Sequence, residues 1–342
     1  MIGETMMRQE SDEAASVIAL QATRNRPALD RLVAQLAARE PAHIVTCARG
    51  SSDHAATYLK YLFETRLGLP VASFAPSVVS VYRARLKLGS ALFVAISQSG
   101  RSPDLVETLA EARASGACTV AIVNDEDSPL AAGADHVLPI SAGPERSVAA
   151  TKSCLGAMAV AARLCASWSG DARLAGALDA LPHALSIARE ADWSPVVSRL
   201  RLTERMLLVS RGLGFAGVLE AALKLKETCM IQAEAFSAAE VRHGPMAIVG
   251  AGFPVLFAST FDPAQRSIDV IADLFASRDA DIYWAGAARQ DATVMPMAAT
   301  VDPALQPIVF LQSFYRLAND LALLRGLDPD RPNSLEKVTK TI

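Results

Sequence analysis

His43-Ile-Val-Thr-Cys-Ala48, followed directly by Arg49-Gly-Ser-Ser-Asp53, is the stretch of the sequence that decides the fold. Its first part is a β-branched apolar run, which is typical of a buried strand. Its second part supplies a glycine turn and small polar residues that suit the start of a helix, which we expect to run through Phe63. A strand, a glycine turn and a helix in this order predict one α/β unit of a parallel sheet.

The same order of elements recurs later in the first half. The apolar run Ala91-Leu-Phe-Val-Ala-Ile96 stops at Ser97-Gln-Ser-Gly-Arg-Ser102, and a helix is expected over residues 104–114. Two further strands are predicted at residues 119–123 and 136–140. Strands that alternate with helices in this way indicate a parallel sheet with helices on both faces.

The second half repeats this pattern. Met206-Leu-Leu-Val-Ser210 is a predicted strand that ends in Arg211-Gly212, just as the earlier strand ends in Arg49-Gly50. Strands at residues 255–258 and 282–285 and a helix at 307–324 complete the second copy. The chain is therefore interpreted as an internal duplication of one α/β domain.

The remaining segments connect or flank the two copies. We expect a helical arm at residues 1–40, a first domain at 41–190, a link at Trp193-Ser-Pro195, a second domain at 196–330 and a tail at 331–342. The tail would by default be frayed. Its residues Leu335 and Val338 instead suggest that it docks, which would place Lys337 in a site where a desolvated amine can form a Schiff base.

Composition excludes several classes of protein. The chain has 342 residues, a net charge of −3 and 51% hydrophobic residues, but every apolar run is too short to span a membrane. The first twenty residues lack the apolar core of a secretory signal, so a cytoplasmic location is expected. The five cysteines show no metal-binding spacing and are predicted to be reduced core residues. Without a basic cluster, nucleic acid is not an expected partner.

Serine residues gather where the first-half strands end. Ligands of open parallel sheets bind beyond the carboxyl ends of the strands. Hydroxyl and amide side chains follow two of these strands, at Ser51, Ser52, Ser97, Gln98, Ser99 and Ser102. Because a helix N-terminus offers unpaired N–H groups and partial positive charge, this edge predicts a phosphate-binding cradle.

An alternative reading of the cradle is purely structural, since Ser99 and Ser102 would also suit helix capping. Arg101 either adds charge to the cradle or faces solvent. A carboxylate at Asp104 would repel a phosphate, so we expect this side chain to point away from the cradle.

The second half instead offers acid-base groups. Glu220, Lys224 and Glu227 stand at i, i+4 and i+7, so they share one helix face. The small apolar residues around them predict a dry surrounding that suits proton transfer, although a surface helix with ordinary ion pairs is the alternative. His243 precedes a Gly-Pro turn and is either a proton shuttle or a structural turn residue.

The combination of motifs resembles the double sugar-isomerase (SIS) domain family. This family includes the isomerase half of glutamine-fructose-6-phosphate aminotransferase and stand-alone glucosamine-6-phosphate deaminases. The matching motifs are Arg49-Gly-Ser-Ser52, Ser97-Gln-Ser-Gly100, Val148-Ala-Ala-Thr-Lys152, Glu220 to Glu227, Ala233-Glu-Ala235, Glu240-Val-Arg-His-Gly-Pro245 and Leu335-Glu-Lys337. The resemblance implies two tandem three-layer αβα domains, each with a flavodoxin-like parallel sheet.

The resemblance also implies roles for individual residues. Sugar-phosphate binding falls on Ser52, Ser97, Gln98, Ser99 and Ser102. Glu227 matches the base that moves a proton between C1 and C2, and His243 matches the ring-opening residue, which in the synthases comes from the second subunit of a homodimer. Lys224 and Glu220 match lining residues, and Lys337 matches a tail lysine that forms a Schiff base. Ala150 replaces a sugar-contacting serine.

The activity that follows from the resemblance is deamination of glucosamine 6-phosphate to fructose 6-phosphate and ammonia, with no metal or organic cofactor. Ser97-Gln-Ser-Gly-Arg-Ser-Pro-Asp104 looks more like the deaminase branch than the synthase branch. Residue 2 is Ile, so the N-terminal cysteine of a glutaminase domain is not expected. The alternatives are an isomerase or deglycase for another phosphorylated sugar, and a regulator that binds a sugar phosphate without catalysis.

Overall fold

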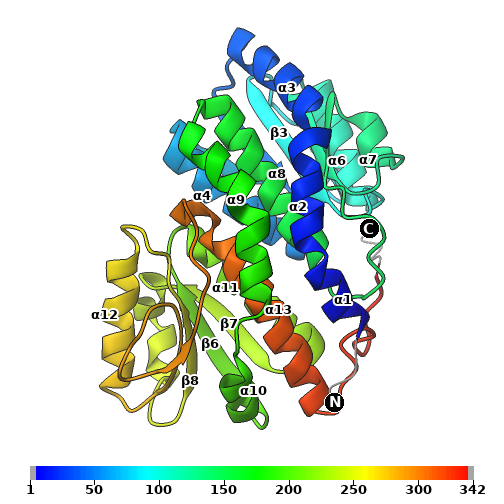
Figure 1. Cartoon of the computed structure of the whole chain (residues 1–342). Coiled ribbons are helices and arrows are strands. Elements are labelled where there is room, and N and C mark those ends of the chain that lie inside the picture. The colour runs from blue at the N-terminus through cyan, green and yellow to red at the C-terminus, as the bar shows by residue number, and fades with distance from the viewer. Residues whose placement is uncertain (1–4, 338–342) are drawn as a thin grey trace. The chain divides into compact units, whose positions relative to one another are not determined.

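The computed structural model describes residues 5–337, and the chain folds into two compact units (Figure 1). Among the described residues, the first-sheet unit comprises residues 16–145, 152–179 and 336–337. The second-sheet unit comprises residues 5–15, 146–151 and 180–335. Helix α9 (Ala172–Arg189) runs from one unit into the other.

The first-sheet unit contains a parallel five-stranded sheet with the strand order β2-β1-β3-β4-β5. This is the flavodoxin-like order 2-1-3-4-5. All seven residues of β3 are buried, as expected for a central strand that is covered on both faces. The strands are β1 (His43–Cys47), β2 (Val71–Ser73), β3 (Ala91–Ser97), β4 (Cys118–Val123) and β5 (His136–Pro139).

Helices cover both faces of this sheet. On one face, Leu105 and Leu109 of α6 and Leu130 of α7 pack against Val45 and Phe93. Helices α3, α4 and α8 contact the strands from the other face, which gives three layers (Figure 1). The helices are α2 (Ala14–Arg24), α3 (Arg26–Ala38), α4 (Ser51–Leu67), α5 (Ser77–Ser80), α6 (Pro103–Ala114), α7 (Pro129–Gly133) and α8 (Lys152–Ser169).

The second-sheet unit has a second parallel five-stranded sheet, with the order β7-β6-β8-β9-β10. When its strands are counted from β6, this order is again 2-1-3-4-5. The predicted α/β fold with two parallel sheets is therefore confirmed. The strands are β6 (Arg205–Ser210), β7 (Gln232–Ser237), β8 (Pro254–Ala258), β9 (Asp281–Ala285) and β10 (Thr293–Met295).

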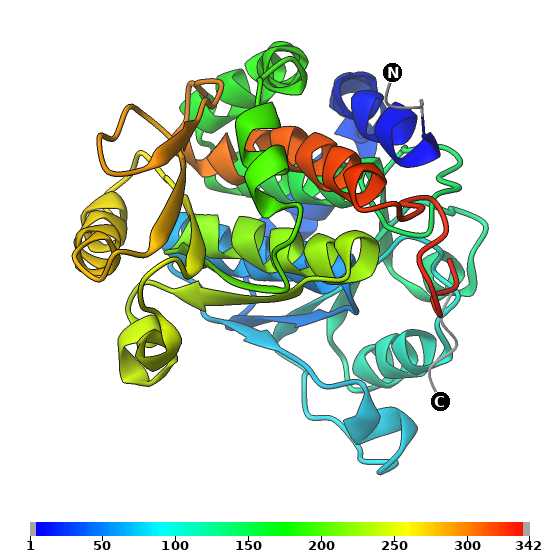
Figure 2. The same cartoon turned by 90° about the horizontal axis from the view of Figure 1, so that it is seen from below.

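Helix α12 packs its apolar side, which includes Ile271 and Phe275, against Phe257 and Trp284 of this sheet. Helices α11 and α13 lie side by side, and α11 contacts β6 and β7 (Figure 2). The helices are α1 (Met6–Asp12), α10 (Ser194–Leu200), α11 (Leu213–Cys229), α12 (Gln265–Ala276) and α13 (Gln306–Leu324), with 3-10 turns at Glu240–His243, Pro245–Ile248 and Pro303–Leu305.

Some elements differ from the sequence prediction. Strands β2, β7 and β10 and helix α12 were not predicted, because the strands are short or carry polar residues. Within the expected link, Trp193 is the N-cap residue of α10, and its buried indole N–H donates to the carbonyl of Pro296 at 2.9 Å. The proposed domain limits remain a prediction.

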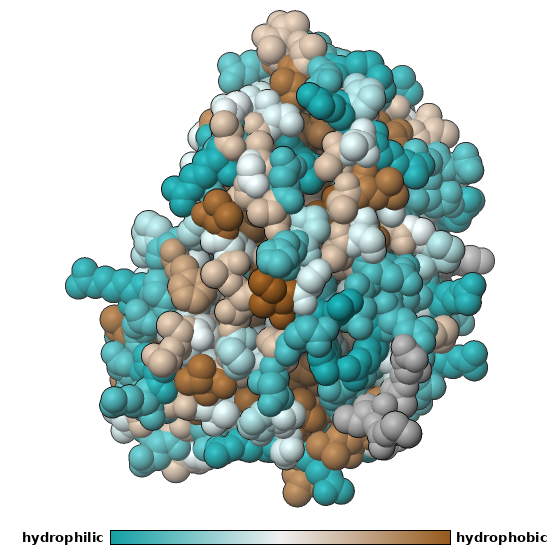
Figure 3. Space-filling model, viewed as in Figure 1, coloured by the Kyte–Doolittle hydropathy of each residue, from teal (hydrophilic) through white to brown (hydrophobic). Residues whose placement is uncertain are grey.

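The surface carries no large apolar stripe on the face seen in Figure 3, where hydrophobic residues are scattered among hydrophilic ones. Among residues 5–337, no helix has both the length and the apolar character that a membrane crossing requires. The cysteines of this part of the chain are free thiols, and all but the half-buried Cys118 are buried.

Candidate active site

Two strands of the first sheet bring the serine-rich segments to one edge. Strands β1 and β3 are adjacent and parallel, and Cys47 at the end of β1 pairs with Ala95 near the end of β3. The segments that follow them therefore begin at the same carboxyl edge of the sheet. From β1 the chain continues to β2 on one side, whereas from β3 it continues to β4 on the other side, so the strand order reverses between β1 and β3. This is the position where flavodoxin-like sheets bind ligands.

The turn after β3 is held by its own hydroxyl groups. Ser97 Oγ accepts a hydrogen bond from the Gly100 amide at 3.0 Å, and Ser99 Oγ accepts one from the Arg101 amide at 3.3 Å. Gly100 has φ +62°, and a Cβ atom there would lie 2.1 Å from Ser128 Oγ. Only glycine fits this turn, because a larger residue would be strained and would also clash.

Other cradle side chains remain available to a ligand. Ser102 occupies the N-cap position of α6, but its side chain makes no capping hydrogen bond. Ser52 and Gln98 are half-buried, and the structure of residues 5–337 shows no side-chain hydrogen bond for either. Hydroxyl and amide groups at a helix N-terminus can donate to a phosphate oxygen.

The expectation that the Asp104 side chain points away from the cradle is wrong. Its side chain is buried, with 2% of the residue exposed, and accepts from Arg49 Nη2 at 2.9 Å and Arg49 Nε at 3.2 Å. Its other oxygen accepts from the Leu105 amide at 2.9 Å. The guanidinium offsets the carboxylate charge, which allows Asp104 to point inward. Arg101 is exposed and pairs instead with Asp125 at 2.8 Å.

The tail is held by polar contacts. Lys337 Nζ lies 2.9 Å from Glu145 Oε2, and the buried Glu145 also accepts from the Ser153 amide and hydroxyl. The expectation that Leu335 anchors the tail is wrong, because this residue is 44% exposed; Val338 lies outside the described residues. Sequence reasoning missed Glu145, which belongs to no recognisable pattern. The half-buried Ala150 presents only a methyl group.

The predicted acid-base stripe, which consists of Glu220, Lys224 and Glu227, lies on α11 in the second-sheet unit. Lys224 forms an ion pair with Glu227 and lies 3.4 Å from Glu220 Oε1. The side chains of Lys224 and Glu220 are fully buried, whereas that of Glu227 is 22% exposed. The alternative of an exposed surface helix is therefore wrong. Tyr315 of α13, which the sequence did not single out, donates its hydroxyl to Glu220 at 3.3 Å.

His243 lies in the same unit, at the end of the 3-10 turn Glu240–His243. Its side chain is exposed, and in the described part of the chain it forms neither a hydrogen bond nor an ion pair. The structure therefore does not join His243 to Glu227 by a direct contact. The cradle residues and Lys337 belong to the first-sheet unit, and the stripe and His243 to the second-sheet unit.

Comparison with known proteins assigns the family. The SIS domain family matches residues 38–166, which span the first sheet and most of α8. A crystal structure from Silicibacter pomeroyi DSS-3, of a protein classed as a phosphosugar isomerase, is 41% identical and superposes with a TM-score of 0.91, covering 96% of this chain and 100% of that one. This chain belongs to the phosphosugar isomerase family.

Two further proteins are similar to this chain over most of its length. Glutamine–fructose-6-phosphate aminotransferase from Thermus thermophilus is 36% identical over 86% of this chain, which spans about half (51%) of that protein's length. The C-terminal domain of the Francisella tularensis glucosamine-fructose-6-phosphate aminotransferase superposes with a TM-score of 0.81 at 22% identity, over 96% of this chain and 99% of that one. At this identity the second match supports the fold alone.

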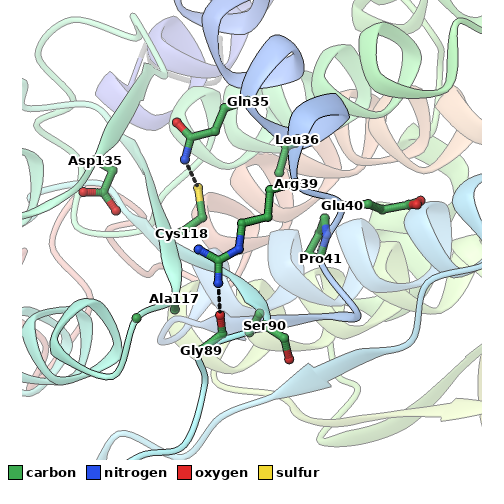
Figure 4. Close-up of a pocket in the computed structure, with 12 residues that line it drawn as sticks. Gln35, Leu36, Arg39, Glu40, Pro41, Gly89, Ser90, Ala117, Cys118 and Asp135 are labelled. Atoms are coloured by element: carbon green, nitrogen blue, oxygen red, sulfur yellow. Dashed lines mark hydrogen bonds between the residues drawn. The ribbon is translucent and has the colours of Figure 1, made fainter.

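A cavity of about 250 Å³ lies at the amino edge of the first sheet, opposite the cradle (Figure 4). Arg39 spans it and donates to the Gly89 carbonyl at 2.7 Å, and Gln35 donates to Cys118 Sγ at 3.4 Å. Ligands of parallel sheets bind at the carboxyl edge, so we do not assign this cavity to the candidate active site.

Proposed function

We propose that this chain is a glucosamine-6-phosphate deaminase, which converts glucosamine 6-phosphate and water to fructose 6-phosphate and ammonia. The observation that carries the proposal is the burial of Lys224 between two carboxylates on α11, with only Glu227 reaching the surface. Desolvation of charged groups costs folding free energy, so the presence of these buried charges favours a chemical role for them.

In the proposed reaction, His243 assists opening of the sugar ring. Glu227 then removes the proton from C2 and returns a proton to C1, which converts the amino aldose to a ketose imine. Water hydrolyses the imine at C2 and releases ammonia. Such a proton shift needs a placed base and stabilisation of the charge that develops on oxygen.

Burial refines the proposed roles of the lysine and the second glutamate. The Lys224 ammonium is fully buried and bonded to Glu227, so we propose that it positions this base and sets its charge environment. Glu220 is fully buried behind it and accepts from Tyr315. It therefore supports Lys224 and does not touch the sugar.

The cradle of the first-sheet unit is the proposed phosphate site. Ser52, Ser97, Gln98, Ser99 and Ser102 supply hydroxyl, amide and backbone donors. Ala150 lacks the hydroxyl that the resemblance places there, so we propose one fewer hydrogen bond to the sugar.

Lys337 is the proposed Schiff-base residue, although it is paired with Glu145 in the structure. Nucleophilic attack requires the lone pair of the amine, so this ion pair must open before Lys337 can react. We propose that the ketose, once bound, displaces Glu145 from Lys337.

We further propose that the second sheet is a second SIS domain, because it repeats the strand order of the first. The exposed His243 suits contribution to the site of a second subunit in a homodimer. Free cysteines suit a reducing compartment, which supports the cytoplasm as the location.

The test is an assay of ammonia and fructose 6-phosphate released from glucosamine 6-phosphate. We expect Glu227→Gln to lower kcat by about 10² to 10⁴, the usual scale of general acid-base catalysis. Glu204→Gln, an exposed change in the same unit, is the control and should retain activity. Ketose formed from other phosphorylated sugars without ammonia would instead show an isomerase, and binding without turnover would show a regulator.

A further inference from the structure

An ion pair joins the two segments that form the cradle. Arg49 follows β1, whereas Asp104 lies in the first turn of α6, after β3. Both Arg49 contacts, from Nη2 at 2.9 Å and Nε at 3.2 Å, reach the same oxygen of Asp104. The pair therefore ties together the two segments between which a ligand of this sheet would bind.

The two partners differ in exposure. The Asp104 side chain is 1% exposed, but that of Arg49 is 48% exposed. A guanidinium carries five N–H donors, and Asp104 engages those on Nε and Nη2 only. The remaining donors, including both on Nη1, make no hydrogen bond in the described part of the chain, and the rigid fork holds them in a set direction.

The cradle otherwise lacks a fixed positive charge. Its side chains are hydroxyls and an amide, and the nearby Arg101 is occupied by Asp125. Asp104 alone would repel a phosphate dianion, and Arg49 offsets that charge. Phosphate recognition in proteins favours arginine, whose planar fork donates two parallel hydrogen bonds.

We propose that Arg49 is a phosphate-binding residue of this site and that Asp104 positions it. This inference rests on the proposed function, since it assumes that the phosphate of the substrate lies in the cradle. Arg49 supplies the charge that the serine residues lack, and the buried carboxylate holds the guanidinium in place before the ligand arrives. Preorganisation of this kind lowers the entropy cost of binding.

The second sheet provides a matched comparison. Gly212 after Arg211 has φ 60° and ψ −132°, close to the φ 54° and ψ −133° of Gly50 after Arg49. In the described residues, however, Arg211 forms no ion pair, and the segment after β8 lacks the serine run. The arginine–carboxylate pair thus occurs where the serine residues are.

The experiment measures the Kd of inorganic phosphate by calorimetry and the kinetics with glucosamine 6-phosphate. For Arg49→Gln we expect Kd and KM to rise about 10- to 100-fold, with kcat changed by less than about threefold, because a charged hydrogen bond is lost from binding. Arg49→Lys should recover part of the affinity. Asp104→Asn should weaken phosphate binding less than Arg49→Gln, and the control Arg211→Gln should leave it unchanged.

The outcomes separate this inference from the proposed function. Unchanged phosphate affinity in a folded Arg49→Gln protein would overturn the inference, even if Glu227→Gln abolishes ammonia release. Loss of phosphate binding in Arg49→Gln, with no ammonia released by the wild type, would support the inference and refute the deaminase. If Asp104→Asn does not fold, the recovery of phosphate affinity by Arg49→Lys still decides the role of Arg49. The double variant Arg49→Lys/Asp104→Glu then tests the role of position 104. A KM equal to that of Arg49→Lys alone would overturn the positioning role of Asp104.

Discussion

Lys224 and Glu227 form an ion pair on one face of α11, and the lysine ammonium is fully buried. Glu220 Oε1 lies 3.4 Å from the same ammonium nitrogen, so two carboxylates share one buried positive charge. Loss of the lysine would leave two negative charges close together in a dry environment. The stripe is therefore a unit in which no single charge can be removed without a cost to the others.

Lys224→Met is expected to destabilise the protein by about 3 to 5 kcal/mol, the usual effect of breaking a buried ion pair. Chemical denaturation measures this loss. The double variant Lys224→Met/Glu220→Gln should recover part of it, because one uncompensated carboxylate is then neutral. Equal stabilities of the single and double variants would show that Glu220 carries no charge that depends on Lys224.

Gly100→Ala is expected to destabilise the fold by about 1 to 3 kcal/mol, because of its positive φ and the clash with Ser128. The same change should weaken phosphate binding, since the turn carries the cradle. The control is Gly176→Ala in helix α9, where a Cβ meets open space. That change should raise stability by about 0.5 to 1 kcal/mol, as alanine suits a helix better than glycine. Thermal unfolding of both variants measures these two stability changes.

The buried cysteines should resist thiol reagents in the folded protein. Burial raises the pKa of Cys47 and of Cys165 to about 12, and that of Cys229 to about 11. Only the thiolate reacts, and at pH 8 these groups remain thiols. The half-buried Cys118 should react first, although burial raises its pKa as well. Titration with a chromogenic disulfide before and after denaturation, with Cys118→Ser as control, tests this order.

Lys337 is expected to be trapped by borohydride in the presence of fructose 6-phosphate, because reduction converts a Schiff base to a stable amine. Mass spectrometry of the digested protein locates the modified lysine. Glu145→Gln should increase trapping at low ketose concentration, since the ion pair at 2.9 Å no longer competes for the amine. Modification of other lysines alone, or equal trapping in Lys337→Arg, would contradict the assignment.

The strand, glycine turn and helix segments were predictable because their signals are local. β1, β3 and β6 are apolar runs that end at a small polar or glycine turn, and these runs identified both parallel sheets. Short strands such as β2 and β10 carry too few residues for a pattern. They form only because a neighbouring strand supplies hydrogen-bond partners.

The sequence by itself determined the α/β fold with two parallel sheets, the glycine turns and the shared helix face of Glu220, Lys224 and Glu227. Periodicity and backbone preference depend on neighbours along the chain, so they can be read without a structure. Only the tertiary structure decided that this face is buried, that Asp104 turns inward to Arg49, and that Lys337 meets Glu145. Burial and charge pairing depend on segments that are distant in the sequence, and the balance between desolvation and ion pairing becomes visible only when those segments are brought together.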